Sequence, residues 1–337
     1  MFNIIRTDKF IWLVLIISLF SACNSDKKVI YELDKLKAID SFRDSIFFSD
    51  ITGMLFDNNG FYYFVDSESS LILKTDTLLR LVDTFGKKGI GPLELETPLQ
   101  IELYKEHLYI NDEYSGKLVK FTKNGEAQSS IDFNFFVDAQ FSIHDEKIYA
   151  FNSGLDGDNA HPIALYNIEK GDFITSFGEK VESSGELFFN RHNLVVDDYL
   201  ISTLAHNIPL VELYNLNGEL LQRADFSKHT IVERRVKDLP RFVNREPSGA
   251  IRTSEVFVCA DYSNGYLYLL FTDWSSTENN VKPNYIFKIL VNPDTIDIKS
   301  VYKLNDGWYE SFIIGANNTL ITYERQNGVI ESYRLPN

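Results

Sequence analysis

Cysteine is scarce in this sequence of 337 residues, which contains only Cys23 and Cys259. Two cysteines cannot build the disulfide framework that is typical of small secreted domains. Cys259 lies in the apolar run 256–260, so we predict a buried, unreactive thiol at that position. No disulfide bond is expected.

Sequence signatures of catalysis are also missing. The six histidines are scattered without metal-ligand spacing, and the chain has no Gly-x-Ser-x-Gly elbow, P-loop or Cys-x-x-Cys pair. Basic residues are few, because 33 Lys and Arg face 48 Asp and Glu, for a formal net charge of −15. An acidic chain repels phosphate groups, so we expect no nucleic-acid partner.

The N-terminus has the features of a secretory signal. Arg6 and Lys9 precede an apolar run over residues 10–20, which is short for a membrane span. Small residues and Cys23 follow this run. The arrangement resembles the lipobox of bacterial lipoproteins, with Phe20 where leucine is commoner. An ordinary signal peptide with an incidental cysteine is the alternative.

The lipobox resemblance implies a cellular location for the mature protein. Residues 1–22 would be the signal peptide, and Cys23 would be acylated and become the mature N-terminus. Several acyl chains give firm anchoring in a membrane. Asn24 does not resemble an inner-membrane retention signal, so we expect a lipid anchor in the outer membrane, with the side that the protein faces left open. Residues 23–28 form the lipidated cysteine and a short polar tether.

A segment of the chain recurs without a gap. Thr84–Pro98 corresponds to Ser176–Asn190, with Phe85 matching Phe177 at an offset of 92 residues (177 − 85 = 92). This offset equals two steps of a period near 45 residues, which is typical of propeller blades. The chain is also 14% aromatic, and aromatic residues favour strands.

Alternating apolar runs closed by turn residues predict strands in groups of four. The groups cover residues 51–85, 99–133, 136–177, 193–226 and 256–304, and a last group of only three strands covers 308–335. Val29–Leu36 reads as a strand, and we expect it to complete the last group, because a propeller must close its ring.

The sequence therefore predicts an all-β fold, a six-bladed β-propeller with four-stranded antiparallel blades over residues 29–337. An insertion at about 227–255 precedes the fifth blade, with a helical segment at Lys228–Asn244. A pair of β-sandwiches is the alternative, but the middle of the chain has no Pro/Gly/Ser-rich linker.

The recurring loop resembles a motif of NHL-like and TolB-like six-bladed propellers, including lipoproteins abundant in Bacteroidota. Their loop reads approximately Phe-Gly-x-x-Gly-x-Gly-Pro-Gly-Glu-Phe. The present chain matches this pattern at Phe85, Gly86, Gly89, Gly91, Pro92 and Glu94, and departs from it at Leu93 and Leu95. The resemblance implies the fold and leaves the activity open, because such families include binding proteins, lyases and lactonases.

The residue types of this loop suit a structural element that joins two blades. Gly89 and Gly91 can take backbone conformations that are closed to other residues, and Pro92 fixes one dihedral angle. Gly86 belongs to the same motif, and Gly178 matches it in the second copy. We expect Glu94 and Glu186 to accept hydrogen bonds from nearby backbone N–H groups. Contact with a ligand is the alternative role.

In a four-stranded antiparallel blade, the connections from the second to the third strand and from the fourth strand to the next blade emerge on the same face. We expect the long connections to lie on that face of the propeller. The segments in question are 86–98, 153–162, 178–190, 227–255 and 274–284. Binding tends to reside on long loops of a rigid scaffold. Arg234, Arg235 and Arg241 in the basic insertion could engage an anionic group, although a solvated helix is the alternative, and Trp274 is a further candidate contact.

Polar residues end several second strands and point towards the same face. Asp66, Asp112, Asn152 and Asp273 have oxygen atoms that could together hold a divalent cation. Polar residues at strand ends are also ordinary turn formers, so both interpretations stay open.

The sequence thus predicts a cell-envelope lipoprotein that acts as a binding or interaction module through its long-loop face. Its partner would be an envelope protein, a glycan or a peptide, and we expect a monomer. A metal-dependent lyase or lactonase, with its site at the mouth of the central channel, is the alternative function. No catalytic residue can be assigned to it from the sequence.

Overall fold

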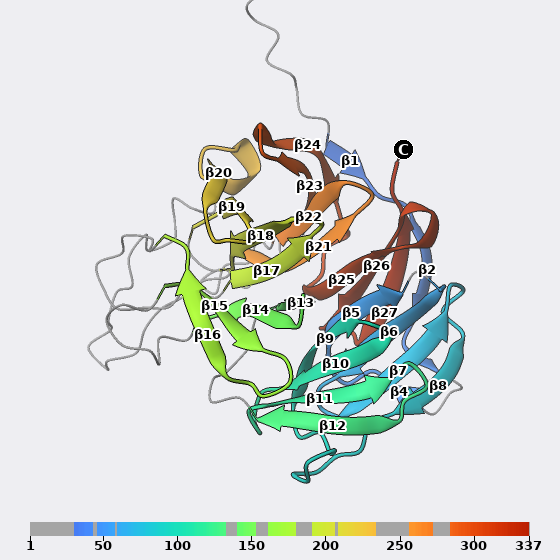
Figure 1. The fold of residues 1–337 in the computed structure, drawn as a ribbon. Coiled ribbons are helices and arrows are strands. Elements are labelled where there is room, and N and C mark those ends of the chain that lie inside the picture. Colours follow the sequence, from blue (N-terminus) through green and yellow to red (C-terminus); the bar gives the residue numbers. More distant parts are fainter. Residues whose placement is uncertain are drawn as a thin grey trace, which may run out of the picture.

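The computed structural model describes residues 30–42, 46–57, 59–132, 140–152, 161–179, 191–205, 208–233, 256–271 and 284–336. In these ranges almost all regular structure is strand (Figure 1). A helical turn covers residues 230–233, inside the segment expected to be helical, and the rest of that insertion up to residue 255 lies outside the described residues. No helix in the described part of the chain is long and apolar enough to cross a membrane.

Six antiparallel sheets follow one another around a ring (Figure 1). Blades 1 to 3 consist of β5 (Ile51–Asp57), β6 (Phe61–Asp66), β7 (Leu71–Asp76) and β8 (Leu81–Phe85); β9 (Pro98–Tyr104), β10 (His107–Asp112), β11 (Lys117–Thr122) and β12 (Ala127–Asp132); and β13 (Ser142–His144), β14 (Lys147–Phe151), β15 (Ile163–Asn167) and β16 (Phe173–Phe177).

Blades 4 to 6 complete the ring. They consist of β17 (Arg191–Val196), β18 (Tyr199–Leu204), β19 (Leu210–Asn215) and β20 (Leu220–Asp225); β21 (Phe257–Ser263), β22 (Tyr266–Phe271), β23 (Tyr285–Asn292) and β24 (Thr295–Lys303); and β25 (Tyr309–Gly315), β26 (Thr319–Glu324), β27 (Val329–Arg334) and β2 (Lys35–Ile39). The first strands of neighbouring blades contact one another in turn around the axis. The chain is a six-bladed β-propeller.

The hydrophobic core lies between neighbouring blades. In β6, Tyr63 and Val65 pack against blade 2, whereas Tyr62 and Phe64 pack against blade 6. Successive side chains of a strand point to opposite faces of its sheet, and both faces of a blade are covered by neighbours. This explains why second strands such as β6, β14 and β22 are nearly continuous apolar or aromatic runs rather than alternating ones.

The N-terminal segment closes the ring as expected, but the strand that does so has different bounds from the predicted ones. Instead of a single strand over Val29–Leu36, β1 (Ile30–Glu32) pairs in parallel with β24, and β2 pairs antiparallel with β27. Leu33 N donates to Lys303 O (3.3 Å), and Lys35 forms an ion pair with Glu331. The chain therefore crosses from the outer edge of blade 5 to that of blade 6, which requires two short strands. A two-stranded hairpin, β3 (Ser41–Phe42) and β4 (Ile46–Phe47), then leads to blade 1.

Every outer strand carries a β-bulge at the same place. The unpaired residues are Leu36, Val82, Gln128, Ile174, Leu221 and Lys299. The first five lie 46, 46, 46 and 47 residues apart, so half of the 92-residue offset is the blade period. Bulges twist an edge strand and hinder its pairing with other chains, and here they aim the bulged side chains outwards.

Candidate interaction face

The two ends of the propeller differ in the length of their connections. At one end, the links from first to second strands and from third to fourth strands are short, and the longest runs from 168 to 172. At the other end, which we call the loop face, the links include 86–97, 152–162, 178–190, 226–256 and 272–284. The expected placement of the long segments on one face is confirmed by these strand bounds.

Buried carboxylates fix the loop face in blades 1 and 2. Asp66 ends β6 and accepts hydrogen bonds from Ser49 N (3.0 Å) and Ser69 N (3.2 Å). Asp112 ends β10 and accepts from Glu96 N (2.9 Å), Thr97 N (2.6 Å) and Ser115 Oγ (2.5 Å). Each carboxylate thus ties the segment that enters its blade to the turn that follows the second strand.

Blade 6 repeats this arrangement with Glu324, which ends β26. Its carboxylate accepts from Trp308 N (3.1 Å), Gln326 N (3.0 Å) and Asn327 N (2.9 Å). We call Asp66, Asp112 and Glu324 the bracing acids. All three are buried, and hydrogen bonds to charged groups contribute more than neutral ones, so the turns beside them are fixed in place.

The loop at 86–97 has its own internal support. Glu94 accepts from Gly91 N (3.0 Å) and forms an ion pair with Lys87, and Leu95 N donates to Lys87 O (2.8 Å). The Lys87 ammonium and Gly91 N–H hold the pKa of the Glu94 carboxyl below its usual value. Gly86 has φ +100°, where a Cβ atom would lie 2.7 Å from Ser70 O, so only glycine fits this turn.

These fixed turns present large apolar side chains to solvent. The exposed fractions are 80% for Ile90, 74% for Tyr114, 65% for Phe47, 39% for Leu93 and 37% for Trp308. All five belong to connections on the loop face of blades 6, 1 and 2. We call this set, with the turns that carry it, the apolar arc.

Polar contacts join the parts of the apolar arc into a continuous surface. The Arg325 guanidinium lies over the Trp308 ring (5.3 Å) and pairs with Asp50 (3.3 Å), which accepts from Ser67 Oγ (2.9 Å). Next along the arc, Lys88 Nζ donates to Glu68 O (2.9 Å).

The second end of the apolar arc is joined through a buried lysine. Lys117 Nζ donates to Gly91 O (2.8 Å) and lies 3.6 Å from the Asp112 carboxylate. Asp112 in turn fixes the turn that carries Tyr114. Polar contacts therefore connect the turns of the arc across three blades.

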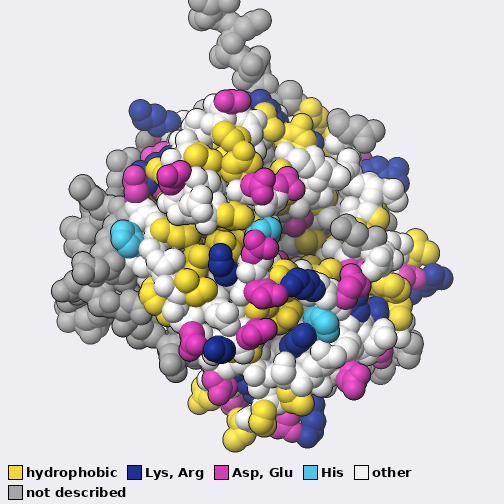
Figure 2. Space-filling view, viewed as in Figure 1, with side chains coloured by type: hydrophobic (Ala, Val, Ile, Leu, Met, Phe, Trp, Pro, Cys, Tyr) yellow, Lys and Arg dark blue, Asp and Glu magenta, His cyan; other side chains and the backbone are white. Residues whose placement is uncertain are grey.

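The first strands are linked to one another around the axis by side chain–backbone hydrogen bonds. The pairs are Ser311 Oγ–Ile51 O (2.7 Å), Thr52 Oγ1–Pro98 O (3.4 Å), Glu102–Ile143 N, Ser142 Oγ–Val195 N (3.1 Å), His192 Nε2–Phe257 O (3.0 Å) and Asp261 Oδ2–Ile314 N (2.8 Å). The Gln140 side chain also bonds both backbone atoms of Ala260 (2.7 and 2.8 Å). Figure 2 shows that the centre of one face is hollowed, with hydrophobic and acidic side chains around the hollow.

Two carboxyl groups near the axis have unusual acidities. Burial raises the pKa of Glu102 to about 8, and the nearby Asp261 carboxylate adds to this shift. Burial likewise raises the pKa of Asp261 to about 6. Cys259 is buried as expected, and burial raises its pKa to about 12, so it stays a thiol. A protonated thiol is a poor nucleophile.

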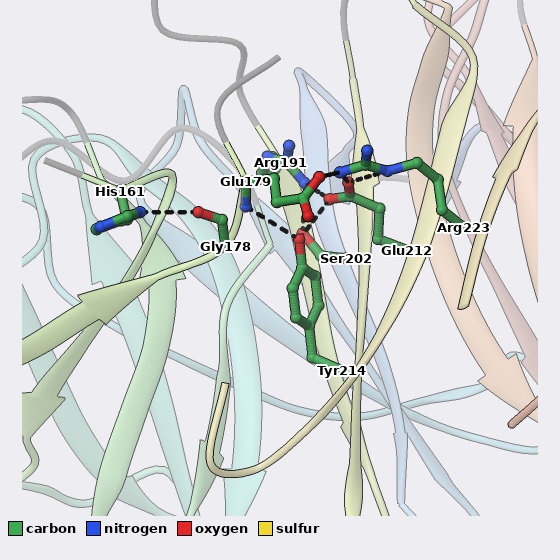
Figure 3. A network of polar contacts seen from close by, with 8 residues as sticks. All are labelled: His161, Gly178, Glu179, Arg191, Ser202, Glu212, Tyr214 and Arg223. Carbon is green, nitrogen blue, oxygen red and sulfur yellow. Dashed lines mark hydrogen bonds and ion pairs between the residues drawn. The ribbon is translucent and has the colours of Figure 1, made fainter. Parts of the chain in front are cut away.

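Blade 4 contains a network of ion pairs around a buried glutamate (Figure 3). Arg191 on β17 and Arg223 on β20 both bind the carboxylate of Glu212 on β19, and Tyr214 OH donates to the same group (2.9 Å). Arg223 also pairs with Glu179 (2.7 Å). Burial raises the pKa of Tyr214, and the Glu212 charge adds to that shift. Because each buried charge has a partner, the network fastens three strands of the blade together.

The structure places the residues expected to bind a metal in separate roles. Asp66 and Asp112 bind backbone N–H groups in different blades, and the backbone N–H of Asn152, itself buried, donates to Pro162 O (3.0 Å). Asp273 lies outside the described residues. Within the described ranges, no group of three or more His, Cys, Asp or Glu side chains could hold a metal ion.

The remaining sequence-derived candidates fall mostly outside the described part of the chain. This applies to Cys23, Glu186, Arg234, Arg235, Arg241 and Trp274. Of the second copy of the recurring loop, Gly178 is described, and its φ of +95° matches that of Gly86. Pro92 is exposed and lies in the turn that carries Ile90 and Leu93.

The apolar arc is not among the features predicted from the sequence. Single aromatic residues such as Tyr114 do not stand out in a chain that is 14% aromatic, and Trp308 is expected only as the first residue of a strand. A usable signal was present, however. A large apolar residue inside a short polar turn, such as Tyr114 in Asp112–Gly116, has no strand face on which to be buried.

Comparisons with known proteins support the fold. No protein-family model and no curated protein sequence matches the chain. Among solved structures, it is similar to a DUF4221 family member from Bacteroides vulgatus (TM-score 0.57, 12% identity, 90% of this chain and 97% of that one). It is also similar to a protein described as exported from Bacteroides fragilis (0.55, 12%, 92% and 99%) and to a streptogramin B lyase (0.50, 13%, 89% and 98%). At these identities the similarity extends to the fold alone.

Proposed function

We propose that this chain is a binding module of the cell envelope, anchored through an acylated Cys23, and that it contacts a partner protein through the apolar arc. The observation that carries the proposal is the exposure of five large apolar side chains on the loop face of three adjacent blades, in which buried carboxylates bind backbone N–H groups of the neighbouring turns. Exposed apolar groups that gather on one face, among polar neighbours, are a mark of interaction sites.

The chemistry of the arc favours a protein as the partner. Trp, Tyr and Arg are the residue types that dominate binding energy at protein interfaces, and Trp308, Tyr114 and Arg325 supply them. Charged residues such as Lys87 and Lys88 surround the apolar groups, in the manner of a polar rim. A rigid surface also loses little conformational entropy on binding.

The envelope location rests on the N-terminal sequence. Residues 1–22 have the features of a signal peptide, and Cys23 directly follows them. One solved propeller of similar fold is described as exported, which agrees with this address. Replacing Cys23 by serine should remove acyl labelling and move the protein out of the membrane fraction. Unchanged membrane fractionation of the Cys23→Ser variant would contradict the anchor.

Site-specific photo-crosslinking in living cells tests the arc. A photoreactive amino acid is placed at Tyr114 or Ile90, and in matched variants at Asp198 or Glu169, which are exposed on the opposite face. We expect one discrete protein adduct from both arc positions and none from the controls. Trp308→Ala should weaken that adduct. Equal adducts from both faces, or none from the arc, would reject the proposal.

A further inference from the structure

We propose that the rim formed by the outer edges of blades 5, 6 and 1 lies against the lipid surface that holds Cys23. The inference rests on the anchor proposed above, and it adds an orientation to it. The anchor rim is defined by five exposed apolar residues: Ile30 (48%), Tyr31 (36%), Leu36 (53%), Leu78 (61%) and Val82 (47%).

The chain enters the propeller at this rim. Ile30 is the first residue of β1, which lies at the outer edge of blade 5 beside β24 (Figure 1). Cys23 precedes it by seven residues (30 − 23 = 7). Seven residues span at most about 25 Å even when fully extended. An acylated Cys23 would therefore keep the edges of blades 5 and 6 closer to the membrane than the opposite edge of the ring.

The five residues are parts of one connected surface. β1 and β2 follow one another through Leu33, which is bonded to Lys303 O. Lys37 Nζ on β2 donates to Leu78 O (2.8 Å) in the turn of blade 1 that precedes β8. Val82 follows on β8. The rim thus continues without a break from blade 5 to blade 1.

Backbone geometry aims two of these side chains outwards. Leu36 and Val82 are the bulged residues of their strands, so neither has a direct partner on the neighbouring strand. Ile174 and Leu221 occupy the same position in blades 3 and 4, on the far side of the ring, with exposures of 46% and 37%. The structure therefore contains matched positions on the two opposite rims.

The two rims also differ in charge. The strand Lys35–Ile39 carries two lysines and no acidic residue, in a chain whose net charge is −15. The Lys35 ammonium pairs with Glu331 and the Lys37 ammonium donates to Leu78 O, so both lysines are held on the rim. The corresponding strand of blade 3, Phe173–Phe177, has no charged residue at all.

This orientation has a consequence for the apolar arc. With the rim of blades 5, 6 and 1 on the membrane, the propeller axis lies along the membrane plane and the loop face is turned sideways. Blades 6 and 1 contribute to both the rim and the arc. The arc would then sit beside the membrane, where a membrane-embedded or membrane-anchored partner can reach it.

Fluorescent labelling at the matched bulge positions tests the inference. Single cysteines at Leu36, Val82, Ile174 and Leu221 are labelled with an environment-sensitive dye in the full-length acylated protein, since buried Cys259 and acylated Cys23 do not react. The protein is reconstituted in vesicles of phosphatidylethanolamine and phosphatidylglycerol. We expect a blue shift, and quenching by spin-labelled lipid, at positions 36 and 82 but not at 174 and 221.

The other outcomes separate the two proposals. If the protein sediments with the vesicles but all four dyes report water, or all four respond alike, the rim is wrong and the anchor stands. If the protein does not sediment with the vesicles, both the anchor and the rim are wrong. Crosslinking from Tyr114 reports on the arc independently of either result. The labelled positions are exposed bulges, and circular dichroism of each variant verifies that it is folded.

Discussion

Blades 6, 1 and 2 differ from blades 3, 4 and 5 at one repeated position. In the first group the second strand ends in Glu324, Asp66 or Asp112, and a turn of four residues follows. In the second group the corresponding residues are Asn152, Leu204 and Phe271. Their connections to the third strand are much longer in blades 3 and 5, at 152–162 and 272–284, whereas that of blade 4, 205–209, is only one residue longer than the turns of the first group.

The difference shows how a repeat with one blade geometry can carry two kinds of surface. A carboxylate at the end of the second strand binds backbone N–H groups on both sides and favours a short, rigid turn. Leu204 and Phe271 contribute to the core but offer no side-chain acceptor to the loop, whereas Asn152 has a neutral amide in place of the carboxylate. The bracing acids therefore mark the three blades in which a side-chain carboxylate ties the turn after the second strand to the rest of the blade.

Removal of a bracing acid should have the largest effect. In Asp112→Ala, the N–H groups of Glu96 and Thr97 lose their acceptor, and the buried Lys117 loses its counter-charge. Breaking a buried charge pair in this way costs about 3–5 kcal/mol of unfolding free energy. Urea denaturation measures the loss, and hydrogen exchange at Glu96 and Thr97 should rise with it.

The control for this substitution is an exposed acid in the adjacent blade. Asp83 on β8 is exposed and bonds only the neighbouring Thr84 N among the described contacts. Asp83→Ala should change the unfolding free energy by less than about 0.5 kcal/mol. If Asp112→Ala cost no more than Asp83→Ala, the turns would be fixed by their backbone hydrogen bonds alone, and the comparison between the two halves would lose its physical basis.

Two equivalent glycines allow a second comparison between the two groups of blades, with a smaller expected loss of stability. Gly86 and Gly178 occupy equivalent loop positions with φ values of +100° and +95°. Alanine at either site should cost about 1–2 kcal/mol for the left-handed backbone. At Gly86 the new Cβ would also lie 2.7 Å from Ser70 O, whereas at Gly178 its nearest neighbour is Pro162 Cγ at 3.1 Å.

Gly86→Ala should therefore destabilise the protein more than Gly178→Ala, because a backbone oxygen in a braced turn cannot move away. Thermal or urea unfolding of the two variants measures the difference. Equal losses would mean that the turn at Ser70 yields as easily as the chain around Pro162, and that the bracing acids do not make the first half stiffer.

Much of the fold could be predicted from the sequence because its signals are local and repeated. The Phe85–Phe177 offset gave the blade period, and alternating apolar runs gave the strands within a few residues. The register of ring closure could not be derived, because Val29–Leu36 satisfies the same apolar pattern in several registers. Only the contacts of Leu33 and Lys35 with blades 5 and 6 determine it.

The candidate site was harder to predict for a different reason. Acidic residues at strand ends fit both a metal site and a turn, and the choice depends on which N–H groups surround them in space. For Asp112 those groups come from residues 96 and 97, about one hairpin earlier in the chain. The apolar arc likewise depends on proximity between blades 6, 1 and 2, which lie at both ends of the sequence.

The smallest effect should come from the two carboxyl groups near the axis, one in each half. Glu102 belongs to blade 2 and Asp261 to blade 5, and burial raises their pKa values to about 8 and about 6. A raised pKa means that the folded state favours the protonated acid. Each group therefore stabilises the fold fully below its unfolded pKa of about 4, and this contribution is lost as pH rises towards the folded value.

Replacing each carboxyl group by a neutral amide should reveal this loss of stability. Relative to the parent, Glu102→Gln should gain stability as pH rises from 5 to 8, whereas the gain for Asp261→Asn should stop near pH 6. Both carboxyl groups keep some contact with solvent, which limits the size of the change below that of the substitutions above. Urea unfolding at several pH values measures both gains. If the difference in unfolding free energy between Glu102→Gln and the parent did not depend on pH, water would solvate the Glu102 carboxylate as fully as that of a surface residue.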